Sequence, residues 1–177
     1  MPERDLDDVA TARARELVAR AVAELSASHA RDEALAEFVP ERRVLGIPRR
    51  ARMTPIGRVW RLGALLLTTD GSLLATGRVI RAERPARRSV TANAVVEQRA
   101  YRAAAVAGGF AEGETVNFDA RPIELDAAAL AQASGPLVLD SGEVFVRWSA
   151  AQPDALTPLE RYLADRVDLL VNPPSGA

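Results

Sequence analysis

The chain has 177 residues, of which 48% are hydrophobic, 27% charged and 5% aromatic. These proportions fit one globular domain and exclude a collagen-like chain, a disulfide scaffold and a protein that is disordered throughout. The formal net charge is −1, from 23 basic and 24 acidic residues, and every base is an arginine because the sequence has no lysine.

The absent residue types exclude several kinds of chemistry. The sequence has no cysteine, which excludes disulfides, thiolate nucleophiles, iron–sulfur clusters and cysteine-based zinc sites. Without lysine, Schiff-base chemistry, a Walker A phosphate loop and a Ser–Lys catalytic pair are excluded as well. We therefore expect no cofactor and no bound metal.

Membrane and export signals are not visible in the sequence. The longest apolar run covers residues 62–67, far short of the roughly 20 residues that a membrane-spanning helix needs. The first residues are acidic and no apolar segment follows them, so no secretory signal is expected. Together with the absence of cysteine, these features predict a cytoplasmic protein without a membrane partner.

Residues 5–38 are expected to form a helical N-terminal region. Apolar residues recur there at spacings of three and four and share one helix face, namely Leu6, Ala10, Ala14, Leu17, Ala21 and Leu25. A break at residues 26–28 would leave a second short helix from Arg31 to Phe38, and Pro40 ends the region. Residues 42–55, with two prolines and five arginines, are expected to be a connector with some extended structure.

Two β-prone runs, residues 59–68 and 72–81, flank the pair Asp70-Gly71. This arrangement predicts a hairpin with a type I′ turn, in which both loop positions have positive φ and Thr69 opposes Ser72. One face of the hairpin is then apolar and packs on helices, with Trp60, Leu62, Ala64, Leu66, Leu73, Ala75, Gly77 and Val79 on it.

The rest of the chain is expected to alternate short helices and strands. First comes a helix from residue 89 or 91 to 107 that stops at Gly108-Gly109, followed by a strand at 116–125 interrupted at Pro122. A helix at 126–132 precedes a hairpin of 137–139 with 144–148 around Ser141-Gly142. The last element is a helix capped by Thr157 that starts at Pro158 and ends near 170.

These elements predict one α+β domain over residues 1–177, with residues 56–170 as its core and residues 171–177 as a frayed tail. We expect a small antiparallel sheet of β-hairpins that is packed on one face by the N-terminal, middle and C-terminal helices.

Charge is segregated along the sequence. Residues 1–40 carry a net charge of −4, residues 41–102 a net charge of +10 and residues 103–177 a net charge of −7. Two interpretations remain open at this point. The acidic ends could neutralise the basic middle inside the fold, or the basic middle could bind an anion, which arginine holds through paired hydrogen bonds.

Four arginines of the expected hairpin are candidate anion-binding residues. In the expected register Arg61 and Arg78 are diagonal neighbours on one face, and Arg58 and Arg81 are diagonal neighbours on the other. Such neighbours lie about 7–8 Å apart, so two guanidinium groups can converge on one anion. We expect these pairs to hold an anionic small molecule or an acidic protein partner.

No residue of the sequence stands out as catalytic. His29, the one imidazole, fits a helix end or surface position better than a general base. The Gly-x-Ser-x-Gly elbow that would supply a serine nucleophile is absent from the sequence. The acidic pairs Glu112/Glu114 and Asp140/Glu143 flank glycines, so turns explain them better than metal ligation does.

Four segments have a pattern that is typical of a protein family. They are residues 41–48, residues 56–81 with Ile-Gly-Arg-Val-Trp-Arg-Leu-Gly at their start, residues 109–114 (Gly-Phe-Ala-Glu-Gly-Glu) and residues 146–149 (Val-Arg-Trp-Ser). Together they resemble a family of small actinobacterial proteins, some of which are labelled glutaminase, over about residues 41–170. The resemblance implies an amidohydrolase. It carries over no catalytic residue, because known glutaminases use a lysine or a cysteine and this chain has neither.

Three functions are therefore open. The first is a non-catalytic binding or interaction protein that uses the Arg-rich hairpin and the connector at 42–52 for an anionic ligand or acidic partner. The second is the amidohydrolase that the resemblance implies. The third is a nucleic-acid-associated protein, which the few scattered aromatic residues disfavour because they offer no stacking platform. An uncovered sheet edge could also pair across a homodimer.

Overall fold

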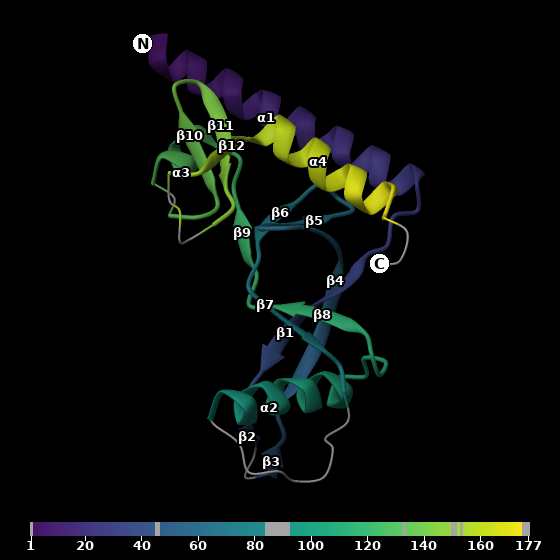
Figure 1. The fold of residues 1–177 in the computed structure, drawn as a ribbon. Coiled ribbons are helices and arrows are strands. Elements are labelled where there is room, and N and C mark those ends of the chain that lie inside the picture. Colours follow the sequence, from purple (N-terminus) through teal and green to yellow (C-terminus); the bar gives the residue numbers. More distant parts are fainter. Residues whose placement is uncertain are drawn as a thin grey trace. The chain divides into compact units, whose positions relative to one another are not determined.

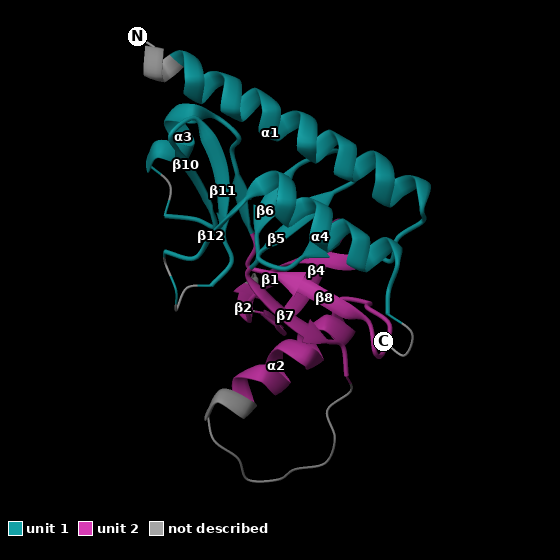
Figure 2. Ribbon diagram, turned by 45° about the horizontal axis from the view of Figure 1, so that its top comes forward, with its two compact units in different colours: residues 1–32, 60–76, 121–177 teal, residues 33–59, 77–120 magenta. Residues whose placement is uncertain are grey.

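The computed structural model describes residues 2–44, 47–83, 93–132, 134–149, 152 and 154–174. The chain divides into two compact units, each with a hydrophobic core of its own. Unit 1 comprises residues 1–32, 60–76 and 121–177, and unit 2 comprises residues 33–59 and 77–120 (Figure 2). The expectation of a single domain over residues 1–177 stays a prediction.

Unit 1 combines two long helices with short strands (Figure 1). Its elements are α1 (Pro2–Ala27), residues 60–62 of β4 (Arg52–Leu62), β5 (Leu65–Thr68), β6 (Leu73–Ala75), β9 (Arg121–Ile123), α3 (Ala127–Gln132), β10 (Leu137–Asp140), β11 (Glu143–Arg147), β12 (Leu156–Pro158) and α4 (Leu159–Val171). Strand β6 pairs with β5 and β9, whereas β10, β11 and β12 form a separate antiparallel sheet.

The core of unit 1 lies where α1 and α4 pack against each other. The predicted stripe of α1 is buried from Ala10 to Leu25, while Leu6 is 57% exposed. Helix α4 buries Leu159, Tyr162, Leu163 and Val167, and Leu170 is partly buried against the same core. Arg13 of α1 also makes an ion pair with Glu160 of α4.

Tyr162 connects α4 to the turn between β4 and β5. Its hydroxyl donates a hydrogen bond to the carbonyl oxygen of Leu62 and accepts one from the N–H of Ala64, each with a donor–acceptor distance of 2.8 Å. Between these two residues Gly63 has a φ of +66°, and a Cβ there would lie 2.4 Å from the Tyr162 hydroxyl oxygen. The turn therefore needs glycine both for its conformation and for the close approach of Tyr162.

Unit 2 is a four-stranded sheet with one helix on it and a two-stranded ribbon at one end (Figure 1). Its elements are β1 (Glu33–Val39), β2 (Arg42–Val44), β3 (Ile47–Arg49), residues 52–59 of β4, β7 (Arg78–Arg81), α2 (Asn93–Ala107) and β8 (Thr115–Phe118). The strand order is β7-β8-β1-β4, in which β1 and β8 are parallel and the other neighbours are antiparallel.

Phe118 is one of the largest residues of the unit 2 core, in which five of the ten buried residues are alanines. It is fully buried, and its ring centroid lies 4.9 Å from that of Tyr101 and 6.3 Å from that of Phe38. The buried alanines around it are Ala34, Ala36, Ala82, Ala104 and Ala105. Small side chains let α2 approach the sheet closely, which makes the geometry of this unit sensitive to added volume.

The predicted α+β class, with helices at both ends of the chain, is confirmed. The main sheet has seven strands in the order β7-β8-β1-β4-β5-β6-β9. It is mixed rather than antiparallel, because β1 and β8 pair in parallel. Pairing between strands so far apart in the sequence depends on tertiary packing, which no local pattern indicates.

The predicted helix over residues 31–38 is wrong. Helix α1 ends at Ala27, and His29 lies in the turn beyond it with a φ of 51°, as expected of a residue at a helix end. Residues 33–39 form β1, which pairs with both β4 and β8. Pairing on both sides overrides the helix preference of the alanines, glutamates and leucine in this segment.

The predicted connector over residues 42–55 is regular structure instead, since it contains β2, β3 and the start of β4. Pro48 lies in the two-stranded ribbon, where an edge position needs no N–H. Pro55 lies next to a β-bulge, at which Ile56 is an extra residue of β4 relative to β1. The prolines therefore mark an edge and a bulge.

The predicted long hairpin of residues 59–68 with 72–81 is also wrong. Strand β4 ends at Leu62, and only β5 and β6 form the hairpin, in which Leu67 pairs with Leu73. Its loop has three residues, and Gly71, with a φ of +85°, is its one positive-φ residue among the described residues. The register is one residue away from the predicted one, so Leu65 and Leu67 enter the unit 1 core in place of Ala64 and Leu66.

The later elements follow the predictions more closely. Helix α3 begins after Asp126, whose Oδ1 accepts hydrogen bonds from the N–H groups of Ala128 and Ala129. The β10–β11 hairpin turns at Ser141 and Gly142, both with positive φ. The strand predicted over 116–125 is two strands, β8 and β9, separated at Asp119, which has a φ of 55°.

The predicted ends of the last helices need two corrections. Helix α4 begins at Leu159 without a side-chain cap, and Thr157 lies on β12. Helix α4 also extends to Val171, where the frayed tail was expected to begin, and residues 175–177 lie outside the described residues. Helix α2 is described from Asn93 to Ala107, so its predicted start at 89 or 91 lies outside the described residues. In the described part of the chain, no helix combines the length and the apolar character needed to cross a membrane.

Candidate anion-binding site

The four candidate arginines do not lie on one hairpin. Arg58 and Arg61 are on β4 and Arg78 and Arg81 are on β7, and β7 pairs with β8 rather than with β4. Within unit 2 two strands separate β7 from β4, which places their axes about 14 Å apart at the usual strand spacing. Arg61 belongs to unit 1 and the other three to unit 2. The predicted diagonal neighbours are therefore not formed.

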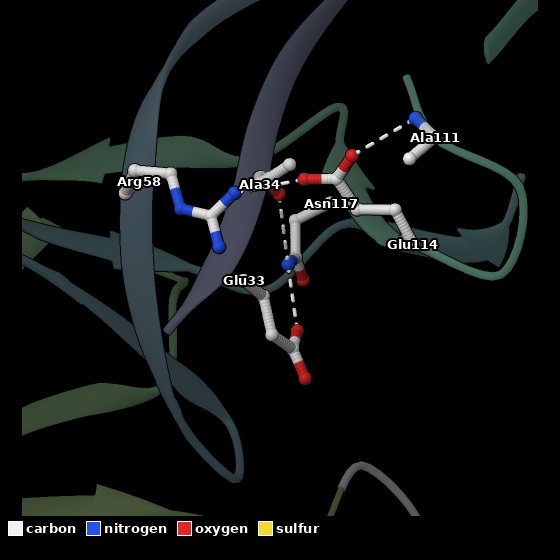
Figure 3. Close-up of polar contacts among 6 residues, drawn as sticks. All are labelled: Glu33, Ala34, Arg58, Ala111, Glu114 and Asn117. Atoms are coloured by element: carbon white, nitrogen blue, oxygen red, sulfur yellow. Dashed lines mark hydrogen bonds and ion pairs between the residues drawn. The ribbon is translucent and has the colours of Figure 1, made fainter. Parts of the chain in front are cut away.

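Arg58 is paired with a carboxylate of its own unit (Figure 3). Its Nη1 lies 2.8 Å from Oε1 of Glu114, whose other oxygen accepts a hydrogen bond from the N–H of Ala111. Beside this pair, the buried amide of Asn117 donates to Glu33 over 2.8 Å and to the carbonyl oxygen of Ala34. These contacts join β1, β4, β8 and the turn after α2, which is a structural role.

Arg78 is surrounded by acceptors in the same way. Its Nη1 lies 2.8 Å from Oε1 of Glu97, its Nε lies 3.6 Å from Oδ2 of Asp119, and its guanidinium stands 5.1 Å from the centre of the Tyr101 ring. Arg102 is likewise paired with Glu83. The partners of these arginines come from unit 2 itself. Glu114 and Asp119 belong to the acidic segment 103–177, so that segment neutralises part of the basic middle within this unit.

The contacts at Arg78 set the ionisation of Glu97. The hydrogen bond from the Tyr101 hydroxyl is the largest single cause that holds the pKa of Glu97 below its ordinary value, and the hydrogen bond and charge of Arg78 lower it further. The same bond to Glu97 raises the pKa of Tyr101. The Glu97 carboxylate therefore favours the folded state above its unfolded-state pKa, and that contribution is lost as the pH falls through the folded-state value.

We expect Tyr101→Phe and Arg78→Gln each to raise the pKa of Glu97 toward that of an unperturbed glutamate, because each variant removes a hydrogen bond to the carboxylate. Carboxyl carbon shifts followed by NMR between acid and neutral pH would measure both changes. A Glu97 titration that is the same in Tyr101→Phe and in the wild-type protein would contradict this assignment of the cause.

A second group of arginines lines a pocket at the end of unit 2. The pocket has a volume of about 400 Å³ and is bounded by four arginines and four small or apolar residues, namely Arg42, Arg49, Arg50, Arg52, Val39, Pro40, Ala51 and Ala107. No carboxylate is among the described residues that line it. Within the described residues, none of its four guanidinium groups makes an ion pair or a side-chain hydrogen bond. The pocket therefore presents four positive charges that no carboxylate of the described residues neutralises.

The pocket is built by a β-arm, which we define as residues 39–44 and 47–52. Strands β2 and β3 continue the β1–β4 ladder, since Val39 pairs with Arg52 and Arg42 pairs with Arg49 in the same register. Because residues an even number of positions apart share a face, Arg42 and Arg49 lie on the face that carries the core residue Met53. Arg42 and Arg49 are thus direct cross-strand neighbours of like charge, an arrangement that destabilises a sheet when no anion lies nearby.

The charge balance of unit 2 leaves the β-arm basic. The unit has thirteen arginines and eight carboxylates, and at least four of those carboxylates are already paired with Arg58, Arg78 or Arg102. The β-arm itself contains five arginines and a single carboxylate, Glu41. Residues 84–92 lie outside the described residues, but their sequence adds three arginines and no acid. The end of α2 at Ala107 brings about half a negative charge to the pocket, which is far less than four guanidinium charges.

The sequence held a signal for this pocket that the connector interpretation obscured. Two arginine pairs, Arg42-Arg43 and Arg49-Arg50, flank a short apolar segment, which is the symmetry of a hairpin with its turn in the middle. The two prolines led to the prediction of irregular chain. The connector at 42–52 was expected to assist in anion binding, but its arginines were not named as site residues.

Hydrolytic chemistry finds little support in the described residues. Two hydroxyl–carboxylate contacts, Thr68 with Asp70 and Ser141 with Asp140, lie in hairpin turns. The pKa of Asp70 is lowered, chiefly by the hydrogen bond from Thr68, as expected of a turn aspartate. No group of three or more His, Asp or Glu side chains in the described part of the chain could hold a metal ion.

Comparisons with known proteins add no relative: no family model, no curated protein and no solved structure matches the chain. The geometry of its own residues therefore carries the functional argument.

Proposed function

We propose that this protein is a non-catalytic binding protein whose β-arm holds the phosphate or other anionic groups of a ligand. One observation carries the proposal: four arginines line a pocket of about 400 Å³, and its described lining includes no carboxylate. Arginine is the side chain best suited to such groups, because its planar guanidinium offers parallel donors to two oxygens. The candidate pairs Arg58/Arg81 and Arg61/Arg78 lack the hairpin that was expected to bring them together.

The repulsion between Arg42 and Arg49 supports an anion at this place. Two unit charges about 6 Å apart repel by only about 0.7 kcal/mol in water, so the empty ribbon can remain folded. An anion between the two guanidinium groups turns that repulsion into attraction. Each charge-assisted hydrogen bond then contributes about 1.5–3 kcal/mol, and about 1.4 kcal/mol corresponds to a factor of ten in affinity.

We expect Arg42→Gln/Arg49→Gln to weaken binding of inorganic pyrophosphate at least tenfold. The matched control is Arg58→Gln/Arg81→Gln, which removes the same charge from the same unit but leaves the β-arm intact. Arginine Nε–Hε NMR signals, followed during a pyrophosphate titration at low salt, would report affinity and location together. Equal loss of affinity in the two double variants, or no saturable binding to the wild-type protein, would overturn the proposal.

A further inference from the structure

Strand β3 of the β-arm begins with exposed apolar residues, which an anion pocket alone does not require. Ile47 is 61% exposed, and Pro48 and Arg49 beside it on β3 are exposed as well. Neither Ile47 nor Pro48 belongs to the core of unit 2. The β-arm therefore presents two exposed apolar residues on β3, with arginines near them on both strands.

From this juxtaposition, and resting on the proposed function, we infer that the ligand is double-stranded DNA. The arginines of the β-arm contact phosphates on both sides of the minor groove, and Ile47 and Pro48 enter the groove as a wedge between base pairs. Apolar side chains used in this way unstack one base step and bend the duplex, while arginine and other polar side chains contact the groove and its backbone.

Charge and dimensions favour a duplex over other polyanions. The five arginines are spread over both strands of the ribbon, and along β3 and the start of β4 the positions 49 to 52 extend over about 10 Å. The minor groove is about 6 Å wide with a row of phosphates on each side, so a two-stranded ribbon fits only if the groove opens, which a wedge causes. The β-arm has no aromatic residue on which the bases of a single strand could stack.

The test uses the full chain and a duplex of about 20 base pairs with an A·T-rich centre and a dye at each end. We expect the logarithm of the binding constant to fall with the logarithm of the salt concentration with a slope of about −4.5, as five phosphate contacts imply. In the Arg42→Gln/Arg49→Gln variant the slope should be about −2.7, because three of the five phosphate contacts remain. Energy transfer between the dyes should increase on binding, because the bend brings the two ends closer together.

The variant Ile47→Ser tests the wedge, and Ile56→Ser is its control. Ile56 is a second exposed isoleucine of unit 2 and lies outside the β-arm. We expect Ile47→Ser to abolish the gain in energy transfer while leaving the salt slope unchanged, and Ile56→Ser to alter neither. Binding without bending, or the same bending in Ile47→Ser as in the wild-type protein, would overturn the inference.

The inference and the proposed function can fail separately. If pyrophosphate binds at the β-arm but the duplex binds no more tightly than a phosphoserine peptide or the single strand, the inference is overturned and the proposed function stands. If neither pyrophosphate nor the duplex binds at the β-arm, both are overturned.

Discussion

Gly108→Ala should destabilise unit 2 by about 3 kcal/mol or more, because the backbone at this position leaves no room for a side chain. A Cβ on Gly108 would lie 1.8 Å from the carbonyl oxygen of Met53 and 2.8 Å from its carbonyl carbon. The obstacle is backbone of β4, and Met53 is itself fully buried, so neither partner can move aside cheaply. The end of α2 would have to separate from the sheet.

The matched control is Gly57→Ala. Gly57 lies on β4, as Met53 does, and an added Cβ there meets no heavy atom within 4 Å. Its effect should stay within about 0.5 kcal/mol, as is usual for a surface change. Urea unfolding followed by circular dichroism compares the two variants, and amide exchange of β1 and β8 assigns the loss to unit 2. Similar stabilities for the two variants would show that α2 does not depend on this close approach. Because Ala107 lines the pocket, Gly108→Ala should weaken anion binding as well.

Phe118→Ala should cost about 3–5 kcal/mol, the usual range for removal of a fully buried aromatic ring. Much of the cavity would persist because alanines make up five of the nine other buried residues of this core and have no side-chain length with which to fill it. The rings of Phe38 and Tyr101 would also lose their contacts with Phe118. Phe118→Leu keeps most of the volume and should cost less than about 1.5 kcal/mol.

Val79→Ala is the control for Phe118→Ala, because Val79 lies on the neighbouring strand β7 but is 45% exposed. Its effect should be below about 0.5 kcal/mol. Trp60 and Trp148 both belong to unit 1, so tryptophan fluorescence follows that unit, whereas amide exchange of β8 follows unit 2. A loss in Phe118→Ala no greater than that in Val79→Ala would contradict the packing described for this core.

Elements whose signals are local could be predicted from the sequence. The apolar spacing of α1 and the Ser141-Gly142 turn each specify their structure within a few residues, and the helices expected at 126–132 and from 158 to near 170 are α3 and α4. The Asp70-Gly71 pair also predicted a turn correctly. Its type was missed, because an Asp-Gly pair fits a three-residue loop with one positive-φ glycine as well as a two-residue type I′ loop.

Elements that depend on distant partners could not be predicted in this way. Strand β1 is composed largely of helix-forming residues and becomes a strand only through β4 and β8. Its misassignment hid the β1–β4 ladder, and without that ladder the arginines of residues 42–52 had no strand to lie on. The basic middle of the chain was thus recognised from charge alone. Its placement on a pocket needed the register of a pairing that the sequence does not indicate.

The packing of α1 on α4 also constrains the order in which the protein can fold during its synthesis. Residues 28–158 lie between the two helices, and at about 5–20 residues per second their translation takes on the order of ten seconds. Over that interval the apolar stripe of α1 has no α4 to cover it and is open to chaperones or to misassociation. Unit 2 contains no residue beyond 120, so it can fold first. Helix α1 can pack only after α4, one of the last elements, has been synthesised.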